Sequence, residues 1–383
     1  MECKQLFDTI EQINDQYIKF WEKVSNIESP SDYKKGVDEV CGCFIDVAEQ
    51  NKWGIEILEN EFSGNPVCIT MNSHINEKPI CLSGHLDTVH PVGSFGSPAV
   101  KIDGDKMFGP GVFDCKGGVV AALEAMVALQ KIGYNKRPVK LLLQTDEEVS
   151  SMPSKKATIN FICEKAKDAI AFLNCECFIG NAAVLWRKGI SLYRIDVFGK
   201  AIHAASCTEG GASAILEAAN KIIELEKFKD NDGLTSNCGL IEGGTKANTV
   251  PDKCSFVVEY RFANSEQFER AEKATYEIVE KCTVKGTSAT VEKIGFRPAM
   301  EKCDRNFDLF DKINKIYIKN GLPELTVRGS MGGSDAADTT SRGIPTIDSI
   351  GVAGDFLHTQ NEFAYISSLK EAVKRIASAV FCL

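Results

Sequence analysis

The chain of 383 residues exceeds what one hydrophobic core usually serves, and at ~150 residues per domain its length favours two domains. Its composition, 44% hydrophobic and 25% charged, is ordinary for a folded globular protein. The net charge of −9, spread without a long run of either sign, repels phosphate backbones and anionic membranes, so we expect neither nucleic acid nor a membrane as a partner.

The cysteines and the N-terminal residues indicate the compartment. The fifteen cysteines are odd in number and irregularly spaced without any C-x-x-C pair, which is typical of buried thiols in a reducing environment. The first residues, MECKQLFDTIEQI, lack the basic and apolar regions of a secretory signal. The apolar run GGVVAALEAMVAL is interrupted by Glu124 well short of the ~20 residues of a membrane span. We therefore expect a cytoplasmic protein without a membrane anchor.

Strand and helix patterns alternate through the first part of the chain. They predict strands at 67–72, 78–84, 139–145 and 169–175 and helices at 118–133 and 157–167. Near the C-terminus they predict helices at 306–321 and 367–381 and a strand at 343–351. Such alternation favours an α/β sheet with helices on both faces, formed by residues 1–185 and 296–383.

A different order of elements fills the intervening segment, residues 186–295. Its patterns predict strands at 191–200, 238–244, 254–262 and 287–296 and helices at 213–228 and 266–282. This β-α-β-β-α-β order indicates a compact α+β module inserted into the first domain.

The segment ICLSGHLDTVHP ends a predicted buried strand with His85 and Asp87. Because alternate residues of a strand point to the same side, the Asp87 carboxylate can accept the imidazole N–H of His85 and fix its tautomer, as in many metal sites. An exposed histidine beside a turn aspartate is the alternative, which an isolated H-x-D pattern leaves open.

Acidic residues follow at the ends of later elements. Asp114 ends the loop GPGVFDCKGG just before a predicted helix. Asp146, Glu147 and Glu148 follow one predicted strand, and Glu176 follows the next. Ligands bind at this carboxyl edge of open α/β sheets, and adjacent acids repel unless cations compensate them. Each signal alone also fits a helix cap or a solvated turn, and the glycine spacing does not fit a dinucleotide loop.

Eight motifs follow one another between Cys81 and Phe363. They are GHLDTVHP, GPGVFDCKGG, TDEEVSS with its following MPS, the glutamate of NCE, GKAIHA, ANTVPD, GGSDAA and FLHTQNEF. In this order they resemble the di-zinc metallopeptidase and amidohydrolase family of glutamate carboxypeptidase, aminoacylase, acetylornithine deacetylase and succinyl-diaminopimelate desuccinylase, and are most similar to the glutamate carboxypeptidase branch. The resemblance implies a zinc-peptidase-like α/β/α catalytic domain with an inserted ferredoxin-like α+β dimerisation domain.

The resemblance also implies a site for two zinc ions, with cobalt or manganese as other candidate metals. Asp114 would bridge the two ions. His85 and Glu176 would complete the ligands of one ion. Glu148 and His358 would complete the ligands of the other. A water between two metals ~3.5 to 4 Å apart becomes acidic enough to attack an amide.

The same resemblance implies catalytic roles for Glu147, Asp87 and His203. Glu147 would stay uncoordinated as the general base that takes a proton from the water and returns it to the leaving amine. Asp87 would orient the metal-binding His85. His203, in GKAIHA, would support the oxyanion from the partner subunit of a homodimer formed through the inserted domain.

Substrate contacts are implied for three side chains and one loop. Asn248 in ANTVPD, Arg261 in EYR and Arg297 in FRPA resemble substrate and carboxylate contacts, although Arg261 could equally be a structural ion-pair residue. The loop GGSDAA offers backbone N–H groups as a nest for a carboxylate. The residues of that nest are Gly332, Gly333 and Ser334.

Four residues depart from the usual pattern of the family or flank its ligand positions. His90 takes a position that is commonly apolar, and we expect it to be partly exposed and not a ligand. Cys115 follows Asp114, and Cys175 and Cys177 flank Glu176. Because adjacent residues of a strand point to opposite faces, we expect these three side chains to point away from the metals and pack. In relatives of this family the peptide bond corresponding to Asp114–Cys115 is cis, so we predict a cis bond here.

The leading hypothesis is a metal-dependent hydrolase that cleaves an amide bond next to a free carboxylate, as carboxypeptidases and dipeptidases do. Its substrates would be small peptides. The first alternative is an N-acyl amino acid deacylase of the acetylornithine deacetylase or desuccinylase type. The second is a non-catalytic metal-binding or ligand-binding relative, against which the retained Glu147 argues, because a binding site needs no unligated base.

Overall fold

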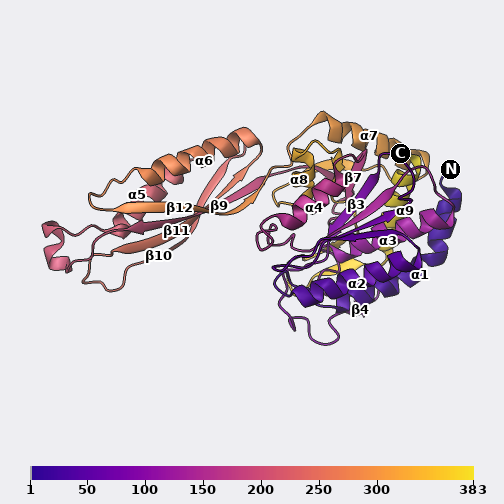
Figure 1. Ribbon diagram of the computed structural model, residues 1–383, viewed down its shortest axis with the longest axis horizontal. Coiled ribbons are helices and arrows are strands. Elements are labelled where there is room, and N and C mark those ends of the chain that lie inside the picture. Colours follow the sequence, from indigo (N-terminus) through magenta and orange to yellow (C-terminus); the bar gives the residue numbers. More distant parts are fainter. Residues whose placement is uncertain (1) are drawn as a thin grey trace. The chain divides into compact units, whose positions relative to one another are not determined.

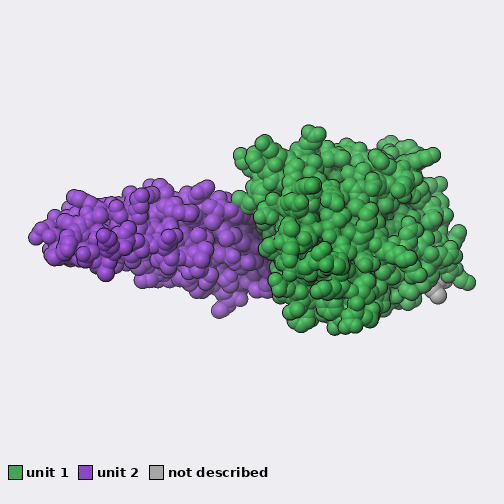
Figure 2. Space-filling view, turned by 90° about the horizontal axis from the view of Figure 1, so that it is seen from below, with its two compact units in different colours: residues 1–185, 302–329, 334–383 green, residues 186–301, 330–333 purple. Residues whose placement is uncertain are grey.

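The computed structural model describes residues 2–383, which form two compact units (Figure 2). Unit 1 comprises the residues up to Leu185 together with Lys302–Gly329 and Ser334–Leu383. Unit 2 comprises Trp186–Glu301 and Ser330–Gly333, so it extends past residue 295 and includes a short segment from much later in the chain. Within the described residues, no helix combines the length and the apolar character needed to cross a membrane.

Unit 1 is built on a six-stranded sheet with the order β1-β2-β6-β3-β7-β14 (Figure 1). Its strands are β1 Gly54–Ile57, β2 Val67–Met71, β3 Ile80–His85, β6 Val139–Gln144, β7 Ala171–Asn174 and β14 Thr346–Ile347. β3 runs parallel to both β6 and β7, and β14 runs parallel to β7, whereas β2 is antiparallel to β6. The carboxyl ends of β3, β6 and β7 therefore meet at one edge of the sheet.

Helices cover both faces of this sheet (Figure 1). They are α1 Lys4–Asn26, α2 Lys34–Gln50, α3 Lys116–Lys131, α4 Ala157–Ala166, α7 Asp304–Lys319, α8 Asp335–Ser341 and α9 Ser367–Cys382. On one face Cys81 and Leu142 pack with Ile159 and Ile162 of α4. Because side chains alternate along a strand, the buried Leu82 points to the other face, where α3 packs on β3 and against α1 and α9. The predicted α/β/α architecture is confirmed.

Further strands form two smaller sheets. β15 Gly354–Asp355, β16 Phe363–Tyr365, β5 Lys106–Phe108 and β4 Lys101–Asp103 form one in that order. β13 Thr326–Ser330 and β8 Ala182–Arg187 form the other. The pairing of β16 with β5 joins a segment near the C-terminus to the chain that leads into α3.

Unit 2 has the predicted ferredoxin-like α+β fold. Its elements are β9 Gly189–Phe198, the 3-10 helix η1 Ala204–Glu209, α5 Ala214–Leu225, β10 Thr235–Gly243, β11 Lys253–Phe262, α6 Ser265–Glu280 and β12 Ser288–Arg297. The antiparallel sheet has the order β10-β11-β9-β12. Alternate residues of β11, such as Phe256 and Tyr260, join a core with Ala218 of α5 and Ala271 of α6, so both helices cover the same face.

The structure contains elements that the sequence did not predict, among them β1, β8 and β13, and it shortens one that was predicted. The strand predicted at 343–351 is reduced to β14, because Pro345 lacks an N–H to donate before it and Ser349 turns the chain with a φ of 61° after it. The N-terminal helices α1 and α2 were not assigned. The small sheet that contains β16 was also not assigned, since its strands have at most three residues.

One carboxyl group in the core of unit 1 makes stability depend on pH. Glu124 of α3 is fully buried, and its two oxygens accept hydrogen bonds from Nδ2 of Asn14 at 3.2 and 3.1 Å. Burial raises the pKa of Glu124 from 4.5 to about 8, although the hydrogen bond from Asn14 opposes the shift. The folded protein therefore holds this proton more tightly than the unfolded chain does.

We expect Glu124→Gln to flatten the pH dependence of the free energy of unfolding. The contribution of the protonated Glu124 is complete below pH 4.5 and is lost as the pH rises towards 8, so the variant should gain up to about 5 kcal/mol relative to wild type between these limits. Urea unfolding at pH 5, 7 and 9 measures the difference. The exposed Glu49→Gln is the matched control, and parallel pH profiles of wild type and Glu124→Gln would contradict the prediction.

Candidate metal centre

Five predicted metal ligands come from separate parts of unit 1. His85 is the last residue of β3, Glu148 follows β6, and Glu176 follows β7. Asp114 precedes α3, and His358 lies in the loop before β16. The parallel pairing of the three strands brings their carboxyl ends together, and the loop before α3 and the C-terminal loop complete the cluster.

Asp114 lies at the centre of this cluster and is itself buried. Its Oδ1 lies 3.1 Å from Nε2 of His85, and its Oδ2 lies 3.1 Å from Nε2 of His358. Each oxygen of the carboxylate thus faces a different imidazole, which is the arrangement that a carboxylate shared by two metals requires.

The distances between donor atoms fit metal coordination. His85 Nε2 lies 3.5 Å from Oε1 of Glu176, and His358 Nε2 lies 3.3 Å from Oε2 of Glu148. Tetrahedral zinc with bonds of ~2.0 to 2.1 Å separates its ligand atoms by ~3.3 Å, so these edges and the two edges to Asp114 have the length that zinc requires. Oxygen and imidazole donors also suit zinc, cobalt and manganese.

Burial and neighbouring charges shift the pKa values of the groups in this cluster. Burial raises the pKa of Glu148 to about 8 and holds the pKa of Glu176 well above its usual range. Burial would also raise the pKa of Asp114, but hydrogen bonds from His358 and His85 outweigh it and hold that pKa well below its usual range. Hydrogen bonds to Asp114 and Glu148 raise the pKa of His358 to about 10. Positive charge, supplied by protons or by metal ions, would reduce the cost of holding these three carboxylates together.

Asp87 lies beneath the cluster with a different set of contacts from the predicted one. Its carboxylate accepts the main-chain N–H groups of Glu147 and Glu148 at 3.1 Å each and the hydroxyl of Ser31 at 2.6 Å. Nδ1 of His85 lies 2.9 Å from the main-chain oxygen of Asp87 and 3.5 Å from its carboxylate. The carbonyl is therefore the closer partner of the imidazole, because the carboxylate is directed at the 147–148 turn.

Glu147 is buried near the cluster but takes no part in its donor groups. Among the described residues, three groups of side chains could hold a metal ion, and none of them includes Glu147. Its charge raises the pKa of both Glu148 and Glu176, after burial and the other neighbours.

Comparison with known proteins identifies the family. The sequence profile of peptidase family M20/M25/M40 matches residues 81–381. The chain belongs to peptidase family M20/M25/M40. Members of this family are metal-dependent hydrolases, and the chain is accordingly a metallopeptidase or amidohydrolase of the M20 type.

Three proteins illustrate the similarity. Carboxypeptidase G2 of Pseudomonas sp. (strain RS-16) is 28% identical over 96% of this chain and 89% of its own length. Acetylornithine deacetylase of Myxococcus xanthus is 30% identical over 51% of this chain and 53% of its own length. The crystal structure of a tripeptidase from Staphylococcus aureus shares the M20 fold with a TM-score of 0.78 and 22% identity, covering 96% of this chain and 97% of that one.

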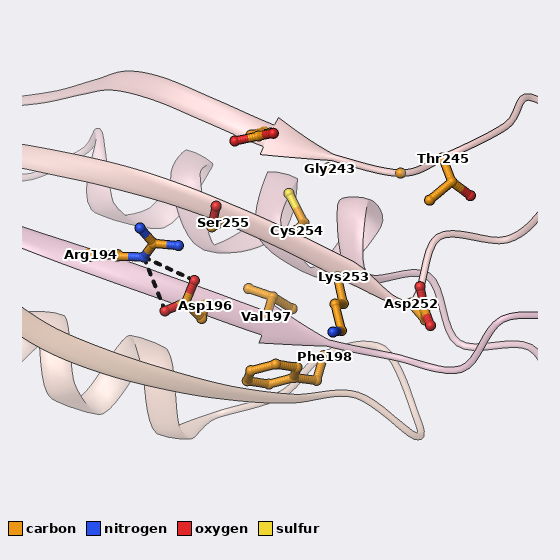
Figure 3. Close-up of a pocket in the computed structure, with 12 residues that line it drawn as sticks. Arg194, Asp196, Val197, Phe198, Gly243, Thr245, Asp252, Lys253, Cys254 and Ser255 are labelled. Atoms are coloured by element: carbon orange, nitrogen blue, oxygen red, sulfur yellow. Dashed lines mark hydrogen bonds and ion pairs between the residues drawn. The ribbon is translucent and has the colours of Figure 1, made fainter.

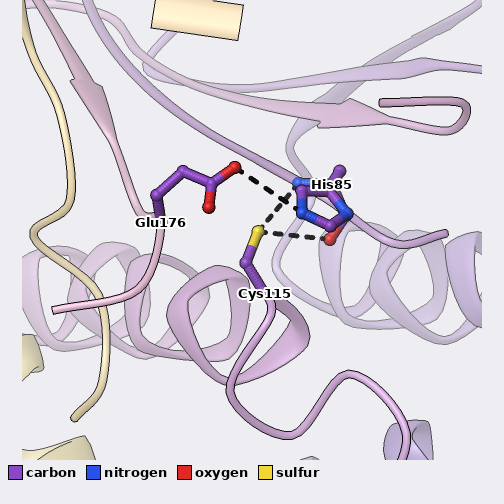
Figure 4. A group of neighbouring side chains, drawn as sticks. All are labelled: His85, Cys115 and Glu176. Carbon is purple, nitrogen blue, oxygen red and sulfur yellow. Dashed lines mark hydrogen bonds and ion pairs between the residues drawn. The ribbon is translucent and has the colours of Figure 1, made fainter. Parts of the chain in front are cut away.

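Two cysteines lie closer to the M20 metal cluster than predicted. The Sγ of Cys115 forms one group with donor atoms of His85 and Glu176 (Figure 4). The Sγ of Cys177 forms another with Asp114 and Glu176, and within each group the atoms lie within 4.8 Å of one another. The expectation that both thiols point away was wrong, because neither cysteine lies inside a regular strand. The bond Asp114–Cys115 is cis, as predicted.

His90 is buried, with 6% of its surface exposed, so the expectation of partial exposure was wrong. Its Nε2 lies 2.8 Å from Oε2 of the buried Glu362, and its ring packs edge-on against Phe95. Glu362 was not singled out from the sequence. Its other oxygen accepts the main-chain N–H groups of Phe113 and Asp114 at 3.0 and 3.1 Å.

Unit 2 of this M20 chain brings His203 and Asn248 together. Both residues are exposed, His203 pairs with Thr249 in a β-bridge, and the N–H of Ala204 donates to the main-chain oxygen of Asn248 at 2.9 Å. Nδ1 of His203 accepts the N–H of Ala205 at 3.2 Å at the start of η1. In the neutral tautomer that fits this contact, Nε2 carries the proton and is the donor.

The loop Ser330–Gly333 is held by arginines of unit 2. Nη1 of Arg187 donates to the hydroxyl of Ser330 and to the carbonyl oxygens of Gly332 and Gly333 at 3.2 to 3.3 Å. Arg261 donates to the carbonyl of Met331 at 3.2 Å and also forms an ion pair with Glu259. Arg261 therefore has the kind of ion-pair partner that a structural role requires. Arg187 also holds this loop, although no sequence motif indicated it.

The predicted carboxylate nest has contacts of its own. The N–H of Gly332 donates to the hydroxyl of Ser330 at 3.3 Å. A Cβ at Gly333 would lie 2.7 Å from Cδ of the buried Arg297, so this close approach requires glycine. Ser334 is the N-cap of α8, and its hydroxyl accepts the N–H of Ala336 and donates to Asp348 at 2.7 Å.

A shallow hollow of about 280 Å³ lies on unit 2 near the ends of β9, β10 and β11 (Figure 3). Its charged residues include Arg194, which forms an ion pair with Asp196 at 3.1 Å, and Lys253 and Asp252. It contains none of the residues assigned above to metal, substrate or catalysis. We therefore assign it no role in the M20 reaction.

Proposed function

We propose that this protein is a di-zinc carboxypeptidase or dipeptidase whose catalytic site lies in unit 1. The observation that carries the proposal is the Asp114 carboxylate, each oxygen of which lies 3.1 Å from a different imidazole. A carboxylate so placed can bridge two ions. The full-length similarity to carboxypeptidase G2 supports cleavage of an amide bond beside a free carboxylate.

The ligand sets follow from the contacts. Asp114, His85 and Glu176 would hold one zinc, and Asp114 with Glu148 and His358 would hold the second. When bound, the two ions supply the acidity that turns a water into a nucleophile at neutral pH. Asp87 positions one ligand of each ion, because its carboxylate fixes the turn that carries Glu148 while its carbonyl holds Nδ1 of His85.

Glu147 would act as the general base. It follows β6 in the same turn as Glu148, and it belongs to none of the groups of described residues that could hold a metal ion. A carboxylate oxygen of Glu147 would take the proton of the attacking water and deliver it to the leaving nitrogen, which converts a poor leaving amide into a neutral amine.

His203 would act from the partner subunit of a homodimer. Its Nε2–H is a neutral donor suited to the developing oxyanion, because Nδ1 is occupied by the N–H of Ala205. Unit 2 offers a dimer surface, since β10 is an edge strand whose Leu240 and Ile241 are exposed, as are Leu216 and Ile223 of α5. Pairing of edge strands would bury these apolar side chains.

The substrate class has one serious alternative. The similarity to acetylornithine deacetylase over about half the chain favours an N-acyl amino acid as the second candidate. Both classes end in a free carboxylate, for which we propose Arg297, Arg261, Asn248 and the backbone of the Gly332–Ser334 loop as contacts. Hydrolysis of a panel of dipeptides and N-acyl amino acids with zinc, cobalt or manganese distinguishes the two.

We expect two metal sites that share Asp114. Anomalous scattering from a zinc-soaked crystal should give two peaks within ~4 Å, and Asp114→Asn should lower the zinc content below two ions per chain. Asp103→Asn, on the exposed strand β4, is the matched control and should retain both ions. A single peak, or two peaks without Asp114 between them, would contradict the assignment.

We expect Glu147→Gln to keep both zinc ions and to lose at least ~10²-fold in kcat on the best substrate of the panel, because the general base is removed. The adjacent Glu148→Gln should instead lose metal affinity. Metal analysis and steady-state kinetics on both variants measure the two effects. If Glu147→Gln loses the metal while Glu148→Gln retains it, the two roles are exchanged.

We expect mixtures of two inactive variants to regain activity. A hybrid dimer of Glu147→Ala and His203→Ala subunits retains one intact composite site, so random exchange should restore about a quarter of wild-type activity. Differently tagged subunits report the exchange, and each variant incubated alone is the control. Proven exchange without recovery would place His203 in its own subunit's site or outside the mechanism.

A further inference from the structure

Glu362 connects two chain segments that carry different metal ligands. It lies four residues after His358, and its Oε1 accepts the main-chain N–H groups of Phe113 and Asp114 at 3.0 and 3.1 Å. Its own carbonyl accepts the N–H of Gly109 at 3.3 Å. The same side chain and backbone thus join the loop of His358 to the loop of Asp114, which are more than two hundred residues apart in sequence.

A buried carboxylate in such a position needs partners for both oxygens. Glu362 is 1% exposed, and leaving one oxygen without a donor would carry a desolvation cost. His90 supplies that donor, with its Nε2 at 2.8 Å from Oε2. The negative charge of Glu362 raises the pKa of the buried Lys116, although burial lowers that pKa by more. Nζ of Lys116 donates its hydrogen bonds to the carbonyls of Val24 and Ile27. The directed hydrogen bond to Oε2 is therefore that of His90.

We propose that His90 is a positioning residue of the metal centre, which acts through Glu362 to fix the orientation of Asp114. With Oε2 held by His90, the Glu362 carboxylate cannot rotate away from the amides of Phe113 and Asp114. The main chain at Asp114 is then held where its side chain reaches both His85 and His358. The inference rests on the proposed metal role of Asp114.

The surroundings of His90 allow packing and hydrogen bonding to be separated. Its ring packs edge-on against Phe95 at 4.9 Å between centroids, and Phe95 is partly exposed. His90→Phe keeps an aromatic ring against Phe95 but removes the donor to Glu362. His90→Gln removes the ring but keeps an N–H donor. Phe95→Leu alters the packing and leaves the hydrogen bond in place.

The test measures zinc affinity by competition with a chromophoric chelator, together with kcat, KM and the thermal midpoint of the metal-free protein. We expect His90→Phe to weaken zinc binding by ~10- to 100-fold, the usual effect of losing a hydrogen bond behind a ligand, and to lower kcat more than it raises KM. His90→Gln should recover most of the affinity. Phe95→Leu should bind zinc as wild type does.

Each other outcome is decisive. Wild-type zinc affinity in His90→Phe, or equal losses in His90→Phe and His90→Gln, would overturn the inference. So would a loss of zinc affinity in Phe95→Leu as large as that in His90→Phe, because packing would then be the cause. If wild-type protein itself binds no zinc, cobalt or manganese, the proposed function fails rather than the role of His90.

Discussion

The candidate metal centre of unit 1 depends on one carboxylate, that of Asp114. Asp114 lies between His85 at the end of β3 and His358 in the C-terminal loop, and both contacts need the sheet, the start of α3 and the strand pair β16–β5 in place. The long packed helices on one face hold the start of α3 against β3. The fold thus serves to bring residues that are far apart in sequence within 3.1 Å of one another.

The second constraint is electrical. Three acidic side chains, those of Asp114, Glu148 and Glu176, lie against the buried imidazole of His85 and the exposed imidazole of His358, and burial raises the pKa of Glu148 and of Glu176. A divalent cation offsets the repulsion between these carboxylates more effectively than a proton does, because it carries two positive charges instead of one. Metal binding should therefore stabilise the folded chain as well as activate it, and the supporting contacts of Asp87 and Glu362 keep the ligands ordered for that purpose.

The features of the fold and of the candidate site that depend on local sequence patterns were predicted. Alternating strands and helices were enough for the α/β/α architecture. Acids placed at strand ends, together with ordered motifs, were enough to predict that His85, Asp114 and Glu176 lie near one another. The contacts of Glu362 and Arg187 are with main-chain groups, which leave no residue-type signal. These contacts and the one from Ser31 to the Asp87 carboxylate were not predicted, because each joins groups that are remote in sequence. His90 was misjudged for the same reason.

Unit 2 is not one continuous stretch of chain. Ser330–Gly333 belongs to it although the flanking residues belong to unit 1, and Arg187 donates to three oxygen atoms of this short segment. A fragment cut at residues 186 and 301 would leave the nearly buried guanidinium of Arg187 without those acceptors. Recombination between relatives would meet the same difficulty, since exchanging 186–301 alone would pair one parent's arginine with the other parent's loop. The two segments should therefore be inherited together.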